Sequence, residues 1–350
     1  MRASYKKYIL NFKRPGGTSR GILHTKETYF LILEEEGKFG IGECGLFRGL
    51  SYDDVPDYEK KCKWVVEHIK LGKESLVSQL MEFPSIQFGV EQAFISLKSE
   101  KPFVLFNSPF VKGQKPIPIN GLVWMGDVDF MHDQIQQKLE QGYDCIKMKI
   151  GAIHFKKEIS LLESIRKKYS KKEIELRVDA NGAFAPHEAL NKLKVLAALD
   201  LHSIEQPIMP GNLEEMKRLC EQTPLPIALD EELIGIIDVT EKEKLLLTVK
   251  PRYIILKPSL VGGFRGSSEW IDLAEKLGIE WWITSALESN IGLNAIAQWT
   301  ATLNNRLSQG LGTGGLFMNN IDSPLEVKNG GLYYNGIKNW NENLIKELCT

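Results

Sequence analysis

Residues 145–180 read CIKMKIGAIHFKKEISLLESIRKKYSKKEIELRVDA, and this stretch decides the fold. It contains two short apolar runs, Cys145–Ile150 and Ile174–Ala180, separated by the amphipathic segment Ile159–Tyr169. A strand, a helix and a second strand in that order are typical of proteins whose parallel strands alternate with helices. The stretch therefore predicts an α/β fold.

The same alternation continues in both directions along the chain. Apolar runs predict eight strands, at Ile117–Trp124, Cys145–Ile150, Ile174–Ala180, Leu201–Gln206, Pro226–Asp230, Tyr253–Lys257, Glu280–Thr284 and Leu307–Leu311. Amphipathic segments between them, such as Glu188–Leu199 and Ser267–Leu277, predict helices. Eight strands alternating with helices are typical of a (β/α)₈ barrel. The competing doubly wound sheet needs a phosphate-binding GxGxxG, and Gly310–Gly315 matches that string without a convincing helix after it.

The chain has a different pattern before residue 115. Three predicted strands, Tyr8–Phe12, Tyr29–Glu34 and Lys38–Gly42, precede helical periodicity between residues 57 and 101, which indicates an α+β unit. A weak hairpin at residues 325–334 is expected to pack back on that unit. The expected organisation is an α+β capping domain at 1–112, a modified TIM barrel at 113–315 and a C-terminal segment at 316–350 that returns to the cap.

Composition excludes several classes of protein. The 350 residues carry a formal net charge of -1, so no global field favours nucleic acid or an anionic membrane. Apolar runs are too short to span a bilayer, and the five cysteines are scattered without a CxxC pair. We expect a cytoplasmic protein that binds a small molecule; the sequence leaves its oligomeric state open.

Charged residues follow five consecutive predicted strands. The carboxyl ends of barrel strands meet at one mouth, where catalytic residues gather. The residues there are Lys147, Lys149, Asp179, Glu205, Asp230 and Lys257. Three carboxylates at one height repel each other unless a cation lies between them, and hard oxygen ligands suit Mg²⁺ or Mn²⁺. A lysine beside such a cation is pushed towards its neutral form, as a general base requires.

Each of these residues alone is more commonly a solvated or salt-bridged charge, so the prediction depends on the whole set. Other candidates leave two interpretations open. Arg177 shares the inward face of Asp179 and either contacts substrate or serves as an ion partner in the barrel core. Ser259 and Ser285 either bind a substrate carboxylate or cap helices, and Glu288 supports the site from behind.

The sequence resembles the enolase superfamily, in its muconate-lactonizing-enzyme-like branch, over nearly the whole chain. The motifs that carry the resemblance are Lys147-Met148-Lys149, Val178–Asn181, Ile204–Pro207, Ala228–Glu231 and Leu256–Pro258. Within the branch, three further segments are similar to the o-succinylbenzoate synthases: Gly17–Gly21, Leu225–Glu231 and Ser285–Gly292.

This resemblance implies a hydro-lyase of menaquinone biosynthesis that converts 2-succinyl-6-hydroxy-2,4-cyclohexadiene-1-carboxylate to 2-succinylbenzoate. Lys149 would remove the proton next to the ring carboxylate and then help hydroxide to leave. Lys257 would stabilise the enolate from the opposite face, and Lys147 would assist electrostatically. The resemblance also assigns Mg²⁺, with Mn²⁺ as a substitute, to Asp179, Glu205 and Asp230. We expect substrate contacts from Arg177, Ser259, Ser285 and Arg20.

Two other functions fit parts of the pattern. An N-acylamino-acid racemase or related epimerase would use the same lysines and metal. The predicted eighth strand ends in Leu311–Gly315 without acids, which argues against a dipeptide substrate. A metal-binding barrel without catalysis is less favoured, because both opposed lysines and all three acids are present.

Overall fold

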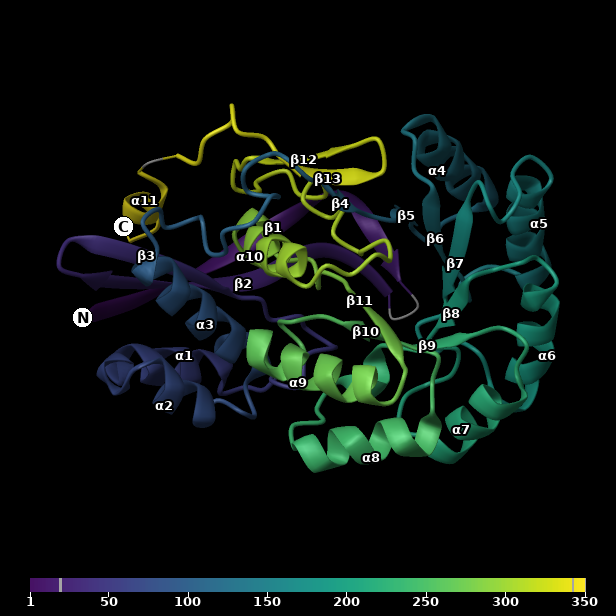
Figure 1. Cartoon of the computed structure of the whole chain (residues 1–350), viewed down its shortest axis with the longest axis horizontal. Coiled ribbons are helices and arrows are strands. Elements are labelled where there is room, and N and C mark those ends of the chain that lie inside the picture. Colours follow the sequence, from purple (N-terminus) through teal and green to yellow (C-terminus); the bar gives the residue numbers. More distant parts are fainter. Residues whose placement is uncertain (19–20, 342, 350) are drawn as a thin grey trace.

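The N-terminal part of the molecule is an antiparallel sheet covered by helices. The computed structural model describes residues 1–18, 21–341 and 343–349. Strands β1 (Arg2–Thr18), β2 (Gly21–Glu35) and β3 (Lys38–Cys44) pair in that order. The helices of this part are α1 (Tyr58–Glu67), η1 (Ile69–Leu71), α2 (Lys73–Ser78) and α3 (Pro84–Lys98). Figure 1 shows these helices beside the sheet, so the strands-then-helices pattern of the sequence produced an α+β unit.

Glycines allow the close packing of α3 on β3. A Cβ atom at Gly42 would lie 2.0 Å from the carbonyl oxygen of Gly89, and one at Gly40 would lie 2.4 Å from that of Ala93. Only residues without a side chain permit the strand and helix backbones to approach this closely. The contact buries Leu31, Leu33 and other apolar side chains of the cap.

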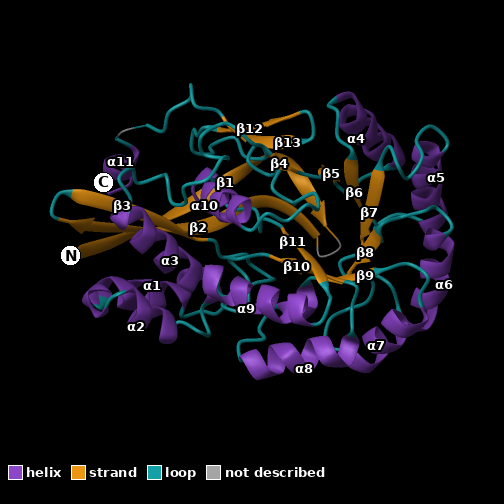
Figure 2. Cartoon of the chain, in the orientation of Figure 1, coloured by secondary structure: helices purple, strands orange, loops and turns teal. Residues whose placement is uncertain are grey.

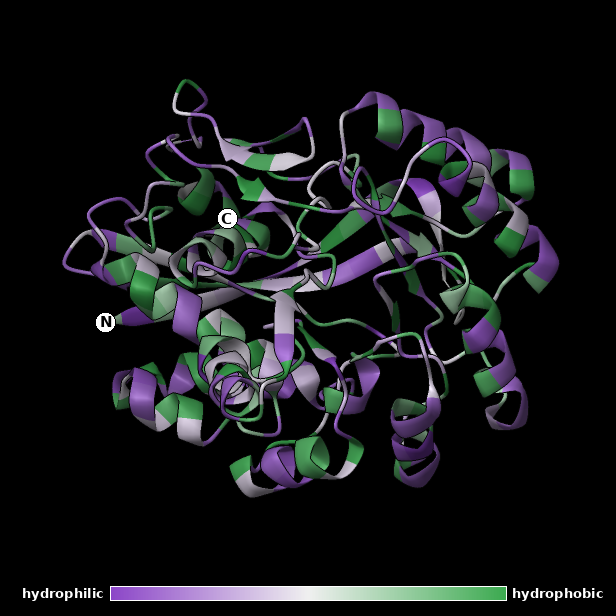
Figure 3. Ribbon diagram, turned by 45° about the vertical axis from the view of Figure 1, so that its right-hand side comes forward, coloured by the Kyte–Doolittle hydropathy of each residue, from purple (hydrophilic) through white to green (hydrophobic). Residues whose placement is uncertain are grey.

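The larger part of the molecule is a curled parallel sheet surrounded by helices (Figure 2). Seven strands pair in chain order: β5 (Gly121–Val123), β6 (Cys145–Lys149), β7 (Glu175–Asp179), β8 (Ser203–Glu205), β9 (Ile227–Leu229), β10 (Tyr253–Leu256) and β11 (Glu280–Ile283). The helices are α4 (Val128–Glu140), α5 (Phe155–Arg166), α6 (Pro186–Ala197), α7 (Leu213–Gln222), η2 (Glu231–Leu233), α8 (Val239–Val249), α9 (Gly263–Lys276) and α10 (Asn290–Thr302). Outer helices alternate hydrophilic and hydrophobic residues, as helices with one buried face do (Figure 3).

The predicted barrel with an N-terminal cap is confirmed, with differences at its seam. The first predicted strand is divided into β4 (Ile117–Pro118) and β5. The eighth prediction, Leu307–Leu311, is wrong in detail: Gln309 and Gly310 make only single parallel bridges, to Ile119 and Thr284. A side chain takes over part of the missing ladder, because Gln309 Oε1 accepts a hydrogen bond from the backbone N–H of Ile283 at 2.8 Å.

The C-terminal segment contacts both parts of the molecule. Residues 316–319 run beside β1, where the N–H of Lys13 donates to the carbonyl of Leu316 at 2.8 Å and Phe12 pairs with Phe317. Helix α11 (Leu344–Cys349) packs against β1 and β2. The hairpin of β12 (Leu325–Lys328) and β13 (Gly331–Tyr334) pairs with β4 instead of the cap sheet, contrary to expectation. None of the described helices combines the length and apolarity that crossing a bilayer requires.

Candidate active site

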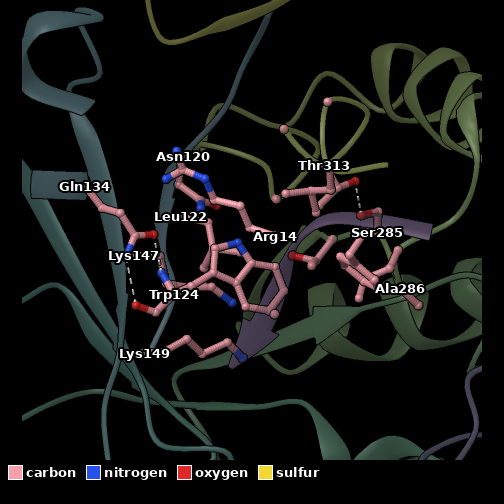
Figure 4. Close-up of a pocket in the computed structure, with 18 of the residues that line it drawn as sticks. Arg14, Asn120, Leu122, Trp124, Gln134, Lys147, Lys149, Ser285, Ala286 and Thr313 are labelled. Atoms are coloured by element: carbon pink, nitrogen blue, oxygen red, sulfur yellow. Dashed lines mark hydrogen bonds between the residues drawn. The ribbon is translucent and has the colours of Figure 1, made fainter. Parts of the chain in front are cut away.

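A cavity of about 360 Å³ opens at the carboxyl ends of the barrel strands, under segments of the cap. The strand ends of the barrel contribute three lysines to its lining, Lys147, Lys149 and Lys257. The cap contributes residues 12–16 of β1 together with Phe47 and Leu50 from the loop after β3. In Figure 4 the ring of Trp124 lies between Arg14 and Lys149. The cavity therefore combines cationic side chains from both the barrel and the cap with apolar and aromatic surface.

Two of the lysines bind the carboxylates of the neighbouring strands. Strand register pairs Lys149 with Asp179, and Asp179 with Glu205. Lys147 Nζ donates to Asp179 Oδ2 at 3.1 Å and to Glu205 Oε2 at 2.6 Å. Lys149 Nζ donates to the same Asp179 oxygen at 2.6 Å and to Asn181 Oδ1 at 2.7 Å. Asp179 therefore holds both lysines at the end of β6.

The third lysine lies at the end of β10, three strands further around the sheet from β7. Lys257 Nζ donates to Asp230 Oδ2, and both side chains are buried. Because β10 and β6 are separated by β7, β8 and β9 in the curled sheet, Lys257 and Lys149 enter the cavity from different walls.

Burial and neighbouring charges shift the proton affinities of these groups. Burial raises the pKa of Glu205 to about 8, and the charges of Asp179 and Asp230 add to the rise. Burial lowers the pKa of Lys147, but Glu205 and Asp179 reverse this and hold it above its usual value. The sequence predicts a neutral lysine only where a dication lies beside it. In the structure Lys147 lies beside carboxylates instead, and these raise its pKa.

The three carboxylates have the chemistry of a Mg²⁺ site. Among residues 1–18, 21–341 and 343–349, no group of three His, Cys, Asp or Glu side chains is arranged to ligate one ion. Asp179, Glu205 and Asp230 instead accept hydrogen bonds from lysines. Glu205 Oε1 is buried and has no hydrogen-bond partner in the described structure. Neighbouring carboxylates, one of which has a buried oxygen without a hydrogen-bond partner, suit a hard cation such as Mg²⁺.

The structure separates the other predicted residues. Ser285 lines the cavity, and its Oγ lies 2.6 Å from Thr313 Oγ1. Ser259 is buried behind the cavity, where its hydroxyl donates to Glu288. Arg20 lies outside the described residues.

Arg177 is directed towards the opposite end of the barrel. Its Nε donates to Glu175 Oε1 at 2.7 Å, and its guanidinium lies 4.2 Å from the ring centre of Trp282. Arg177 is 1% exposed and absent from the cavity lining. These contacts match the barrel-core interpretation of Arg177 and give no support to a substrate contact.

Sequence reasoning missed several residues of the cavity. Arg14, Asn120, Trp124, Asn181 and Thr313 line it. Asn181 had a signal, because it closes the same strand-end motif as Asp179. Trp124 ends the first predicted strand, and its backbone N–H and carbonyl bind the side chain of Gln134 at 2.9 and 3.0 Å. Arg14 reaches the cavity only through the tertiary placement of β1.

This combination of a capped parallel barrel and opposed lysines beside strand-end acids agrees with comparisons to known proteins. Residues 131–335 match the family described as enolase C-terminal domain-like. The muconate lactonizing enzyme from Pseudomonas fluorescens is 22% identical and superimposes with a TM-score of 0.82 over 99% of this chain and 98% of that chain, which shows the shared fold. The chain therefore belongs to the enolase C-terminal domain-like family, as its motifs indicated.

Within that family, the similarity is to one group of enzymes. The chain is 44% identical to o-succinylbenzoate synthase from Desulfotalea psychrophila, over 94% of this chain and 98% of that protein. The crystal structure of MenC from the same organism superimposes with a TM-score of 0.85 at 41% identity, covering 95% of this chain and 99% of that one. L-Ala-D/L-Glu epimerase from Bacillus subtilis is 28% identical, over 92% and 89% of the two chains. The chain belongs to the o-succinylbenzoate synthase family.

Proposed function

We propose that this protein is a Mg²⁺-dependent o-succinylbenzoate synthase of menaquinone biosynthesis. It dehydrates 2-succinyl-6-hydroxy-2,4-cyclohexadiene-1-carboxylate to 2-succinylbenzoate in the cytoplasm. The observation that carries the proposal is that Lys149 and Lys257 line one cavity from different walls, next to three buried carboxylates. The 44% identity to the Desulfotalea psychrophila enzyme supports the substrate assignment.

Lys149 is the proposed base and acid. Its neutral amine removes the proton on the carbon that bears the ring carboxylate, and the electron pair of that C–H bond moves into the enolate. The resulting ammonium then protonates the departing hydroxyl, so water leaves and the ring becomes aromatic. Asp179 and Asn181 hold Nζ at 2.6 and 2.7 Å, which fixes the direction from which the proton is taken.

Lys257 is the proposed electrostatic partner on the other face. Burial lowers its pKa, but Asp230 and Glu205 outweigh burial, so the pKa lies above its usual value and the ammonium stays charged. A charged group facing the planar enolate stabilises it through a cation–π contact. Lys147, more deeply buried, supports the same charge balance through Asp179 and Glu205.

Asp179, Glu205 and Asp230 would hold Mg²⁺, or Mn²⁺ in its place, and the bound cation would stabilise negative charge on the substrate carboxylate. The cap residues Phe47 and Leu50, with residues 12–16, exclude water from the cavity during the reaction. The partner is a small carboxylate, which the cationic side chains of Lys13 and Arg14 in the cavity lining attract.

An ultraviolet assay tests the proposal. Purified protein is mixed with the cyclohexadiene carboxylate in the presence of Mg²⁺, and again after chelation. We expect loss of the diene absorbance only with metal. No change in absorbance, with metal binding demonstrated by titration, would contradict the dehydratase.

A second candidate is a racemase of N-acylamino acids, because two lysines on different walls can remove and return a proton on opposite faces. An N-succinyl-L-Arg/Lys racemase from Bacillus cereus is 26% identical over 51% of this chain. Exchange of the substrate α-proton in deuterated water, followed by NMR, distinguishes this activity from dehydration.

A further inference from the structure

Three buried ionisable side chains lie where the cap contacts the barrel, outside the cavity. Lys26 comes from β2, Glu43 from β3, and Glu288 from the loop between β11 and α10. Lys26 is 5% exposed and both carboxylates are fully buried. Lys26 Nζ has no hydrogen-bond partner in the described part of the chain. Lys26 precedes Thr28 by two residues on the same face of β2, and the Thr28 hydroxyl donates to Glu43 at 2.8 Å. Burial lowers the pKa of Lys26 below its usual value, and the charges of Glu43 and Glu288 oppose that shift.

Glu43 joins the cap to the start of α10. Its carboxylate accepts hydrogen bonds from the backbone N–H groups of Ser289 and Gly292, at 2.9 and 2.8 Å, and from the hydroxyls of Ser289 and Thr28. The first N–H groups of a helix have no partner within the helix and attract an anion. Glu43 therefore satisfies the N-terminus of a barrel helix from the cap.

Glu288 joins two walls of the cavity. It accepts hydrogen bonds from the Ser259 hydroxyl and from the backbone N–H of Ala286, the latter at 2.8 Å. Ser259 follows Lys257 by two residues, and Ala286 lines the cavity. Between Ala286 and Glu288, Leu287 has a φ of 63°, a left-handed conformation that a branched side chain rarely adopts. The Glu288 carboxylate thus fixes a strained turn and the segment that carries Lys257.

The cap also covers this carboxylate directly. A Cβ atom at Gly45 would lie 3.2 Å from Cγ of Glu288 and 3.2 Å from Cβ of Ser259. Two carboxylates enclosed in this way require a compensating positive charge, because an unpaired buried charge either protonates or draws in water by opening the contact. Lys26 is the cation that the cap brings to them.

We propose that Lys26 is a positioning residue, whose buried ammonium balances Glu43 and Glu288 and so keeps the Lys257 wall of the cavity in place. It touches neither substrate nor metal ligands, and it acts through Glu288 on Ser259 and Ala286. The inference rests on the proposed function for its kinetic measurement, whereas the charge balance itself can be measured without substrate.

The test is a cycle of four proteins: wild type, Lys26→Met, Glu288→Gln and the double variant. Methionine retains most of the volume of lysine without its charge, and glutamine can still accept from Ser259. In Lys26→Met two carboxylates are uncompensated, so we expect kcat to fall by roughly tenfold or more, with a smaller change in KM. In Glu288→Gln the pair of Lys26 and Glu43 remains balanced, and kcat should stay within roughly threefold of wild type.

The double variant decides the question. With Glu288 neutralised, Glu43 is the remaining carboxylate and keeps its hydrogen bonds, so kcat should recover to near that of Glu288→Gln. A double variant as slow as Lys26→Met, or a Lys26→Met protein with the kcat of wild type, overturns the proposal. If Lys26→Met fails to fold, a folded and active double variant supports the charge balance, and an unfolded one overturns it.

Lys242→Met is the matched control. Lys242 is also a buried lysine, 2% exposed. Its Nζ lies 2.7 Å from Glu269 Oε2, and neither residue lines the active-site cavity. We expect this variant to lose stability while its folded fraction keeps the wild-type kcat. Thermal unfolding of the cycle gives a separate measurement: Lys26→Met should unfold at a lower temperature, and Glu288→Gln should restore part of the loss. A wild type without dehydratase activity contradicts the proposed function alone, because the unfolding cycle still tests the charge balance.

Discussion

The two ends of the barrel are built from the same strands, but they use charge differently. On β7, Arg177 and Asp179 point inward two residues apart. Arg177 pairs with Glu175 at the floor, where the ring of Trp282 covers its guanidinium. Asp179 holds Lys147 and Lys149 at the mouth, where both ammonium groups line a cavity. The strand therefore contributes one closed ion pair and one that opens onto space for a ligand.

The two ends of the barrel also differ in the type of cationic side chain, arginine at the floor and lysine at the mouth. A guanidinium does not release its proton in proteins, so Arg177 suits a permanent structural charge. An amine can release its proton when its surroundings change, and this allows a lysine to act as base and acid. Inward direction alone therefore does not identify a catalytic group; the end of the strand and the chemistry of the cation decide it.

The largest effect is expected at the mouth, at Lys149. Lys149→Ala should lower kcat by roughly a thousandfold or more, because it removes the amine that takes the proton. Lys257→Ala should cause a comparable loss through the enolate. The measurement is the ultraviolet assay, with circular dichroism to establish that the fold is intact.

Lys149→Arg sharpens this test, because it keeps the positive charge and removes the proton transfer. We expect it to be as inactive as the alanine variant. Activity above a tenth of wild type in any of the three variants would reject the mechanism with two lysines.

The second effect concerns the metal. Asp230→Asn should weaken Mg²⁺ binding by roughly ten- to a hundredfold, since it replaces a charged oxygen ligand by a neutral one. Isothermal titration with Mg²⁺ measures this, and saturating metal should restore part of the activity. An unchanged metal affinity would remove Asp230 from the ligand set.

The third effect is expected at the floor of the barrel, where the Arg177 ion pair is structural. Arg177→Met should lower the free energy of unfolding by about 1–3 kcal/mol, because it removes an ion pair and a contact with an aromatic face. The folded variant should keep the kcat of wild type. Urea denaturation and the ultraviolet assay measure the two quantities, and a tenfold loss of kcat would show that the floor takes part in catalysis.

The smallest effect is a pH dependence at the floor. Burial lowers the pKa of His202 to about 4, although Glu175 opposes the shift. Below pH 6.5 the unfolded chain binds this proton and the folded protein does not, so stability falls as the pH drops from 6.5 towards 4. The loss between pH 7 and 5 should be roughly 2 kcal/mol. His202→Phe should flatten that part of the stability profile, and an unchanged profile would assign it to other groups.

Much of the fold and the centre of the site could be predicted from the sequence. The strands from β6 to β9 were located within two residues at either end, because short apolar runs between amphipathic helices are a strong local signal. The same runs gave the residues at their carboxyl ends, and thus the lysines and acids now seen together.

The remaining features depend on contacts that no local pattern encodes. Leu307–Leu311 has the composition of a strand. However, the backbone N–H of Ile283 donates to the side chain of Gln309, where a regular strand would offer a backbone carbonyl. Arg177 occupies an inward-facing position in the alternation of its strand. Only its contacts with Glu175 and Trp282 place it at the floor of the barrel. Arg14 enters the cavity because β1 folds over the barrel, which its neighbours in sequence do not indicate.

The pairing of β1 with residues 316–319 has a consequence for how the protein is made. Asn11 and Lys13 leave the ribosome early, but their partners Asn319 and Leu316 follow about three hundred residues later. At a synthesis rate of roughly 5–20 residues per second, β1 is synthesised at least about fifteen seconds before residues 316–319. The cavity roof therefore forms late in synthesis, and a nascent chain stalled within the barrel exposes the apolar surface that the roof covers.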